Sequence, residues 1–167
     1  MQKHTISVLV NDQPGVLARV ANLFGRRGFN IDSISVGNSE EKGLSRMIIV
    51  TEGDEKTLEQ VTKQLHKLID VIKVHQLSDA PMVSREIVLM KVDAAPAVRS
   101  EITGVIEPFR ATIVDVGPSS VIVQSTGDSE KIEALIELLR PYGIRELSRT
   151  GVTAMSRGMV PALKLQA

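Results

Sequence analysis

The sequence has no cysteine and no tryptophan, and its 167 residues include only three phenylalanines and one tyrosine. Without cysteine there can be no disulfide, thiolate zinc site, iron–sulfur cluster or thiol nucleophile, and this lack is typical of proteins kept in a reducing compartment. With so few aromatic rings, the hydrophobic cores must be built from Val, Ile, Leu and Met. We therefore expect a cytoplasmic protein without disulfides.

The chain also has no excess charge, because 20 Lys and Arg balance 20 Asp and Glu. A neutral chain offers no electrostatic attraction for nucleic acid or an anionic membrane. No segment approaches the roughly 18 consecutive apolar residues that a membrane helix needs. We expect neither nucleic acid nor a membrane as a partner.

Recognisable catalytic motifs are missing as well. The glycines form no G-x-G-x-x-G, G-x-x-x-x-G-K-[ST] or G-x-S-x-G pattern. The three histidines, His4, His66 and His75, have no ligand-like spacing to Asp or Glu, and we expect them at surface or edge positions. The sequence therefore predicts no catalytic residue and no metal site, so the chain is not expected to be an enzyme on its own.

The hydrophobic pattern alternates between strand and helix periods in a fixed order that occurs twice. In the first half the expected strands are 5–10, 29–36, 44–51 and 71–77, and the expected helices are 16–27 and 54–69. After a short polar hinge the order recurs, with strands at 86–92, 111–116, 121–126 and 144–148 and helices at 96–109 and 129–139. The tail after Gly151 has no clear pattern and is left unassigned.

Two copies of a β-α-β-β-α-β unit predict an α+β protein with two tandem ferredoxin-like domains. We place the first domain at residues 1–78, a linker at 79–83 and the second domain at 84–167. Such a unit covers only one face of its sheet, and a 75-residue unit buries only about 60% of its unfolded surface. We therefore expect the domains to pair, within the chain and between chains.

One turn could carry chemistry, the stretch from Asn11 to Gly15 before the first helix. Gly15 has no side chain, so backbone N–H groups at the helix start are open to a carboxylate, which the helix dipole favours. Asn11 and Asp12 offer oxygens for an ammonium group, and Val16 and Leu17 could form an aliphatic wall. A free amino acid has these three features. The alternative is that Asn11 or Asp12 simply caps the helix.

A second candidate is the start of the second strand. Asn30 presents an amide beside the branched Ile31. An ordinary turn after the helix, with Gly28 in the left-handed conformation, explains these residues equally well.

Longer segments resemble a known family. These segments are HTISVLVNDQPGVLARVANLFGRRGFNIDSISVG, LSRMIIVTEGDEKTLEQVTKQLHKLIDVIKV, SREIVLMKV and SRTGVTAMSRG. Together they resemble the small regulatory subunit of acetolactate synthase (acetohydroxyacid synthase) over essentially the whole chain. The NDQPGVLARV and RRGFNI segments are similar to those of an ACT domain.

The resemblance implies that the first domain is an ACT domain that pairs in a homodimer. It implies that a separate large subunit catalyses the condensation of pyruvate with thiamine diphosphate, Mg and FAD, so that this chain binds no cofactor. It also implies that the chain activates the large subunit and confers feedback inhibition by valine or a related branched-chain amino acid.

The same resemblance implies an effector site between the loop before the first helix of one subunit and the second strand of its neighbour. In this sequence the corresponding positions are Asn11, Asp12, Gly15, Val16, Leu17, Asn30 and Ile31. Several family members carry Asn where this chain has Asp12, which leaves open which side chain meets the ligand.

Two other functions occur in proteins with a similar order of elements. RNA-recognition motifs share the same order of elements, but they need aromatic residues on the central strands, where this chain has aliphatic ones. A stand-alone tandem-ACT amino-acid sensor, acting on another enzyme or on transcription, fits the pattern more closely.

Overall fold

The structure is a computed structural model that describes residues 2–158. These residues divide into two compact units. One contains the residues up to Val83 together with residues 152–158, and the other contains Ser84–Gly151.

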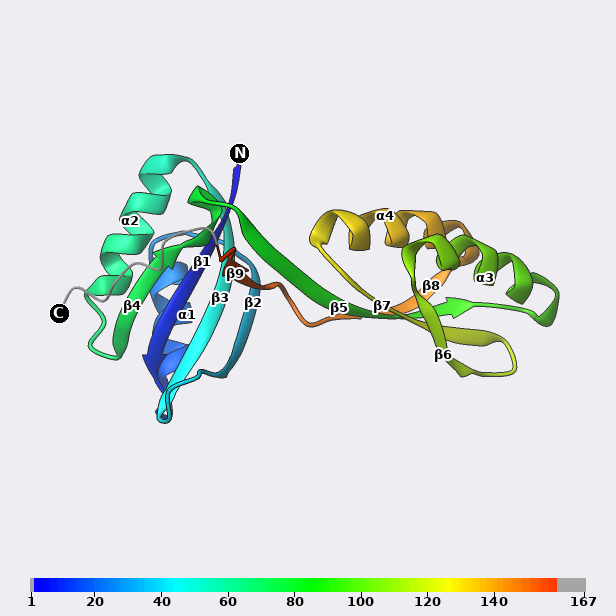
Figure 1. Cartoon of the computed structure of the whole chain (residues 1–167), viewed down its shortest axis with the longest axis horizontal. Coiled ribbons are helices and arrows are strands. Elements are labelled where there is room, and N and C mark those ends of the chain that lie inside the picture. The colour runs from blue at the N-terminus through cyan, green and yellow to red at the C-terminus, as the bar shows by residue number, and fades with distance from the viewer. Residues whose placement is uncertain (1, 159–167) are drawn as a thin grey trace. The chain divides into compact units, whose positions relative to one another are not determined.

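The first unit is a four-stranded antiparallel sheet in the order β2-β3-β1-β4. Helices α1 and α2 cover one face of this sheet (Figure 1). The elements are β1 (Gln2–Asn11), α1 (Val16–Arg26), β2 (Ile31–Asn38), β3 (Leu44–Gly53), α2 (Glu55–His66), β4 (Val71–Gln76) and the short 3-10 helix η1 (Leu77–Asp79).

Local signals explain most of these boundaries. Asp54 caps α2 by accepting a hydrogen bond from the Thr57 amide at 2.7 Å, as its position predicts. The expected irregularity in the second strand is a register shift between Ile31 and Ser33. The prediction that the second helix extends to Ile69 is wrong, because α2 stops at His66 and Ile69 is 92% exposed.

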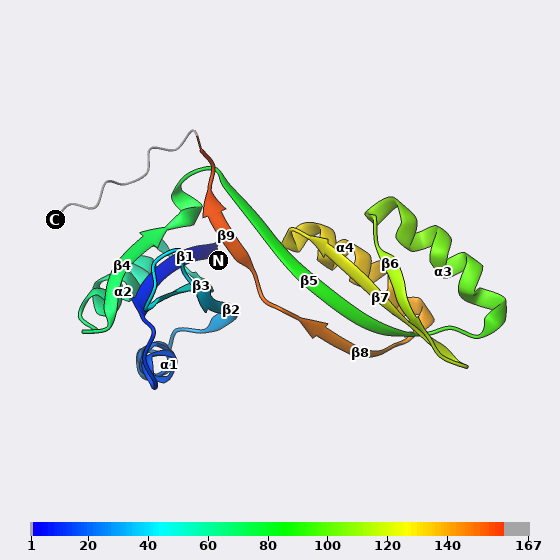
Figure 2. The same cartoon turned by 60° about the horizontal axis from the view of Figure 1, so that its bottom comes forward.

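The second unit repeats the arrangement, with strand order β6-β7-β5-β8 and helices α3 and α4 on one face (Figure 2). Its elements are β5 (Met82–Asp93), which starts in the first unit, η2 (Pro96–Val98), α3 (Arg99–Ile106), η3 (Glu107–Phe109), β6 (Thr112–Val116), β7 (Ser120–Gly127), α4 (Ser129–Leu139), η4 (Arg140–Tyr142) and β8 (Ile144–Arg149). The predicted architecture of two ferredoxin-like domains is confirmed.

The expected continuous helix over 96–109 is divided into a central α-helix with a 3-10 turn at each end. Pro96 and Pro108 each lie in the first turn of a 3-10 segment. Proline cannot donate a backbone hydrogen bond and is disfavoured inside an α-helix, so the α-helical part ends before Pro108.

The tail after Gly151 forms a further strand, β9 (Thr153–Ser156), which pairs with β5. The Val152 amide donates a hydrogen bond to the Ser33 hydroxyl at 2.8 Å, and the Ser35 hydroxyl donates one to the Val152 carbonyl at 2.9 Å. Val152 and Ala154 are buried in a small core with Ile48, Val50 and Leu77.

This arrangement corrects two expectations. Residues 152–158 belong to the first unit, not to a second domain at 84–167, and Met82 and Val83 of the expected linker are already part of β5. The chain's own strand β9 covers part of the sheet face that was expected to pack against another copy. The assignment of residues 159–167 lies outside the described residues.

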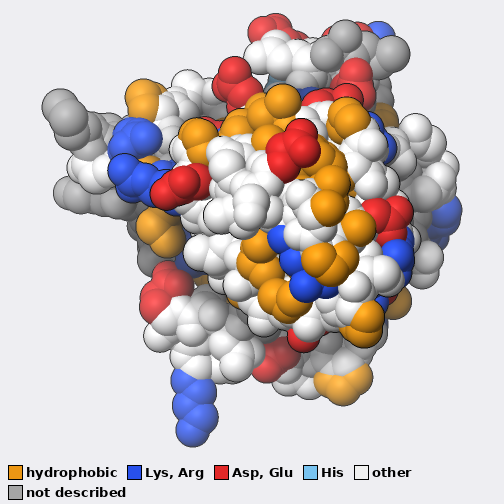
Figure 3. Space-filling model, turned by 90° about the vertical axis from the view of Figure 1, so that its right-hand side faces the viewer, with side chains coloured by type: hydrophobic (Ala, Val, Ile, Leu, Met, Phe, Trp, Pro, Cys, Tyr) orange, Lys and Arg blue, Asp and Glu red, His pale blue; other side chains and the backbone are white. Residues whose placement is uncertain are grey.

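Each unit has its own mainly aliphatic core, as the scarcity of aromatic residues requires. His4 is buried rather than at the surface, and its Nε2 lies 3.0 Å from the carbonyl oxygen of Gly53. Over the second unit, hydrophobic side chains lie among charged ones (Figure 3). The large apolar side chains that remain exposed in this unit are Ile87, Leu89, Val114, Val116, Leu138 and Leu147.

Candidate effector site

The turn between β1 and α1 is fixed by its own backbone hydrogen bonds. The Asn11 amide donates to the carbonyl of Asp70, and the Asp12 amide donates to the carbonyl of Gly43, both at 2.9 Å. Gly15 has φ of 86°, in the left-handed region where an L side chain is strained. The turn is therefore held at its base, and its tip requires glycine.

Helix α1 begins without a side-chain cap. Gly15 is its N-cap residue, no side chain of the described part of the chain accepts a hydrogen bond there, and the first turn has no acidic residue. The alternative that Asn11 or Asp12 caps the helix is therefore wrong. The amides of Leu17 and Ala18 lie in this uncapped turn, where a helix favours an anion.

Arg19 adds a cation to the same turn. Its Nη1 lies 3.2 Å from the position that a Cβ on Gly15 would occupy. Its Nε and Nη2 bond the carboxylate of Asp70 at 3.0 and 2.6 Å, which holds the guanidinium in place. Arg19 was not among the residues predicted for this site, although its position four residues after Gly15 places it one helical turn away.

The two aliphatic candidates differ in exposure. Val16 is 3% exposed and belongs to the core of the first unit, so it cannot be an open pocket wall. Leu17 is 48% exposed and remains available for contact. Of the pair, only Leu17 fits the expected role in this chain.

The second candidate segment is positioned by β3. The Asn30 carbonyl accepts from the Thr51 hydroxyl at 2.6 Å, and the Asn30 side-chain amide donates to Asp32 at 2.5 Å. Ile31 is half-buried and packs against the core. Asn30 is exposed, so its amide is accessible despite the bond to Asp32.

Within one chain the two segments lie far apart. Asn11 pairs with Leu44 at one end of β3, and Ile31 pairs with Thr51 near the other end. Seven residues of extended strand span about 23 Å at roughly 3.3 Å per residue. One copy therefore does not bring the predicted site residues together.

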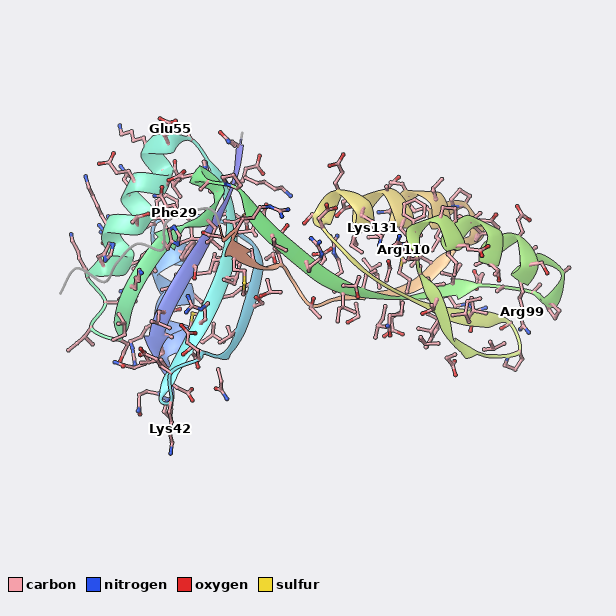
Figure 4. All side chains as sticks on the ribbon, in the orientation of Figure 1. Phe29, Lys42, Glu55, Arg99, Arg110 and Lys131 are labelled. Carbon is pink, nitrogen blue, oxygen red and sulfur yellow. The ribbon has the colours of Figure 1, made fainter. Side chains whose placement is uncertain are left out.

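A cleft elsewhere in the first unit is less suited than the turn to binding an amino acid's carboxylate. It has a volume of about 520 Å³ and its lining residues include Glu55 (labelled in Figure 4), Glu59 and Asp79. Lys63 also lines it, but its ammonium already pairs with Glu59 at 2.6 Å. The acidic side chains would repel a carboxylate.

Residues 2–158 contain no group of three or more His, Asp or Glu side chains placed to hold a metal ion. None of the helices in this part of the chain is long and apolar enough to cross a membrane.

Comparison with known proteins assigns the family. Residues 85–158 match the family described as the small subunit of acetolactate synthase, and residues 6–73 match the small subunit-like ACT domain of the same enzyme. The chain belongs to the family of acetolactate synthase small subunits. Its first unit is accordingly an ACT domain, in agreement with the resemblance found in the sequence.

Individual small subunits agree over nearly the full length. The probable acetolactate synthase small subunit of Methanothermobacter thermautotrophicus is 58% identical over 156 residues, 93% of each chain. That of Bacillus subtilis is 52% identical over 93% of this chain and 91% of its own. The crystal structure of the small subunit from Thermotoga maritima aligns with a TM-score of 0.85 at 46% identity, covering 94% of this chain and 98% of that one.

Proposed function

We propose that this chain is the regulatory subunit of acetolactate synthase in the biosynthesis of valine, leucine and isoleucine. It binds the catalytic large subunit, raises its activity and confers feedback inhibition by valine or a related branched-chain amino acid. Family membership supports this assignment over a sensor that acts on another enzyme. The thiamine diphosphate, Mg and FAD of the reaction belong to the large subunit, and this chain holds none of them.

The observation that carries the effector proposal is the uncapped start of α1 beside the Arg19 guanidinium. A free amino acid presents its carboxylate to the amides of Leu17 and Ala18, with Arg19 adding positive charge. Oxygens of Asn11 and Asp12 are available to its ammonium group. The exposed Leu17 contacts its branched side chain.

A second copy supplies the other half of this site. Within residues 2–158, the outer edge of β2 has no neighbouring strand in its sheet. If two copies pair antiparallel along this edge, the start of one β2 lies beside the end of the other. The end of β2, at Asn38, pairs with Ser45 of β3. The neighbouring residue of β3, Leu44, pairs with Asn11, so the end of β2 lies near the turn. This pairing of copies moves Asn30 and Ile31 of one copy toward the turn of the other.

The ligand then acts through the dimer. An amino acid that bridges two copies binds one dimer arrangement better than another, and it shifts their equilibrium by at most that difference in affinity, typically about 1–3 kcal/mol. The large subunit responds to the arrangement that the effector favours.

Gly15→Asp tests the carboxylate position. The new carboxylate would lie beside Arg19 and at the uncapped amides, where the ligand's carboxylate binds. We expect valine inhibition of the reconstituted enzyme to be lost while activation of the large subunit is retained. Enzyme assays with and without valine, and calorimetric titration of the purified chain, measure the two effects.

Gly151→Asp is the matched control. Gly151 also has a left-handed φ, of 81°, so the variant carries a similar backbone cost, and it belongs to the second unit rather than to the turn. It should remain sensitive to valine. Unchanged valine affinity in Gly15→Asp would show that the effector binds elsewhere, and failure of the wild-type chain to activate the large subunit would refute the regulatory role.

A further inference from the structure

The second unit contains a basic cleft that the effector proposal does not use. Its volume is about 510 Å³, and it is lined by residues from the start of β5, the turn into β6, the end of β7 and the start of α4. Arg85, Arg110 and Lys131 contribute three positive charges. Figure 4 shows Arg110 and Lys131 on neighbouring parts of the unit.

These cations are not neutralised by the residues around them. Asp128 is the one acidic residue of the lining, and its Oδ1 already accepts from the Lys131 amide at 2.9 Å as the cap of α4. Lys131 Nζ and Arg85 Nη1 bond backbone carbonyls, of Thr126 and Ser84. Within the described residues, no carboxylate lies within 4 Å of the charged nitrogens of Arg85, Arg110 or Lys131. The cleft therefore has an excess of positive charge.

Ser125 gives an independent sign of a missing partner. It lines the cleft, it is only 2% exposed, and its hydroxyl has no hydrogen-bond partner among the described residues. A buried hydroxyl without a partner is unfavourable, and such groups are rare in native proteins. A ligand oxygen that reaches the hydroxyl from the cleft would satisfy it.

We propose that this cleft binds the phosphate group of a small anionic ligand. Guanidinium groups bind phosphate through paired hydrogen bonds, and a lysine adds a further charge-assisted bond. The three cations outweigh the single carboxylate by two charges, which matches a phosphate dianion better than one carboxylate. The hydroxyls of Thr112, Ser125 and Thr126 supply neutral donors, and the volume falls within the range of small-molecule sites.

Calorimetric titration of the full chain with inorganic phosphate at constant ionic strength tests the proposal. We expect saturable binding that acetate does not reproduce. Glycerol phosphate and pyrophosphate, titrated in parallel, distinguish a site for a phosphate ester from one for the free ion. Lys131→Gln should weaken phosphate binding about tenfold, the loss of one charge-assisted hydrogen bond.

Two variants separate binding from folding. Arg110 has φ of 53°, a conformation that asparagine adopts readily, so Arg110→Asn removes the charge with little backbone cost. It should also weaken phosphate binding about tenfold. Ser125→Ala removes an unbonded hydroxyl, so it should reduce phosphate affinity several-fold without lowering the thermal midpoint.

Lys42→Asn is the charge-matched control, because Lys42 is exposed in the turn between β2 and β3 of the first unit (Figure 4). Phosphate affinity should be unchanged in this variant. The proposal is overturned if phosphate binds no better than acetate, or if Arg110→Asn and Ser125→Ala bind it as the wild type does. An effect of Lys42→Asn equal to that of Arg110→Asn would also overturn it, since it would indicate attraction by net charge alone.

Discussion

Tyr142 is the only tyrosine of the chain, and its hydroxyl donates a hydrogen bond to the Glu101 carboxylate at 2.8 Å. That hydrogen bond, with smaller contributions from desolvation and the negative charge of Glu101, raises the pKa of Tyr142 above its ordinary value. A pKa raised in the folded state stabilises the fold below the ordinary pKa of tyrosine. This contribution is lost as the pH rises through the folded value.

Glu101→Ala should therefore lower the pKa of Tyr142 toward its ordinary value. Ultraviolet titration of the phenolate measures this pKa directly, because no tryptophan or second tyrosine absorbs. Glu107→Ala, which removes an exposed acid that Tyr142 does not contact, should leave the titration unchanged. An identical pKa in wild type and Glu101→Ala would show that the bond to Glu101 is absent in solution.

Single residues also show how far the candidate effector site is predictable. Gly15 is recognisable because a glycine before a helix, after proline, indicates a special turn. The role of Arg19 is not, because its guanidinium is held by Asp70, 51 residues away in the sequence. Only folding brings such residues together, so spacing alone gives no sign of their contact.

Among the strands of residues 2–158, β9 is the one that the hydrophobic pattern failed to identify. It has four residues, and only Ala154 of these is buried, so its periodicity is too short to detect. It is fixed by long-range contacts, with Val152 bonded to Ser33 and Ser35 and packed near Ile48. The returning strand thus stabilises the first unit from the far end of the sequence.

Val152→Asp should destabilise the first unit by about 3 kcal/mol, because it places a carboxylate in an apolar core that offers it no cationic partner. Chemical denaturation followed by circular dichroism measures the free energy of unfolding. Thr153→Asp, at the adjacent exposed position, should change it by no more than about 0.5 kcal/mol. Equal stability of Val152→Asp and the wild type would mean that β9 does not dock in solution.

At the scale of the whole molecule, the proposed function requires two copies. Val36 lies on β2 at the edge proposed to pair, and it is 47% exposed. It pairs with Met47 and so lies on the face of the sheet that carries the helices. Together with the exposed Leu17 on α1, it gives apolar surface at the proposed contact between copies.

Val36→Lys should weaken the proposed homodimer at least about tenfold, because each contact would bury a charge without a partner. Sedimentation equilibrium measures the dissociation constant, and valine affinity should fall with it. Ile72→Lys is the control, since Ile72 is similarly exposed, at 48%, but lies on β4 at the opposite edge of the sheet. If Ile72→Lys dissociates the dimer and Val36→Lys does not, the copies pair through the β4 edge and our proposal of the β2 edge is wrong.

The sequence by itself determined the two β-α-β-β-α-β repeats, most boundaries of their elements and the special turn at Gly15, because periodicity, caps and glycine conformation act between residues close in the chain. It also carried the family resemblance. Only the tertiary structure decided that residues 152–158 return to the first unit and that Asp70 holds the Arg19 guanidinium beside Gly15. It also separated the two candidate segments to opposite ends of β3 and left the Ser125 hydroxyl without a hydrogen-bond partner among residues 2–158. The first two features depend on contacts between residues 51 and 119 positions apart, which no local pattern encodes.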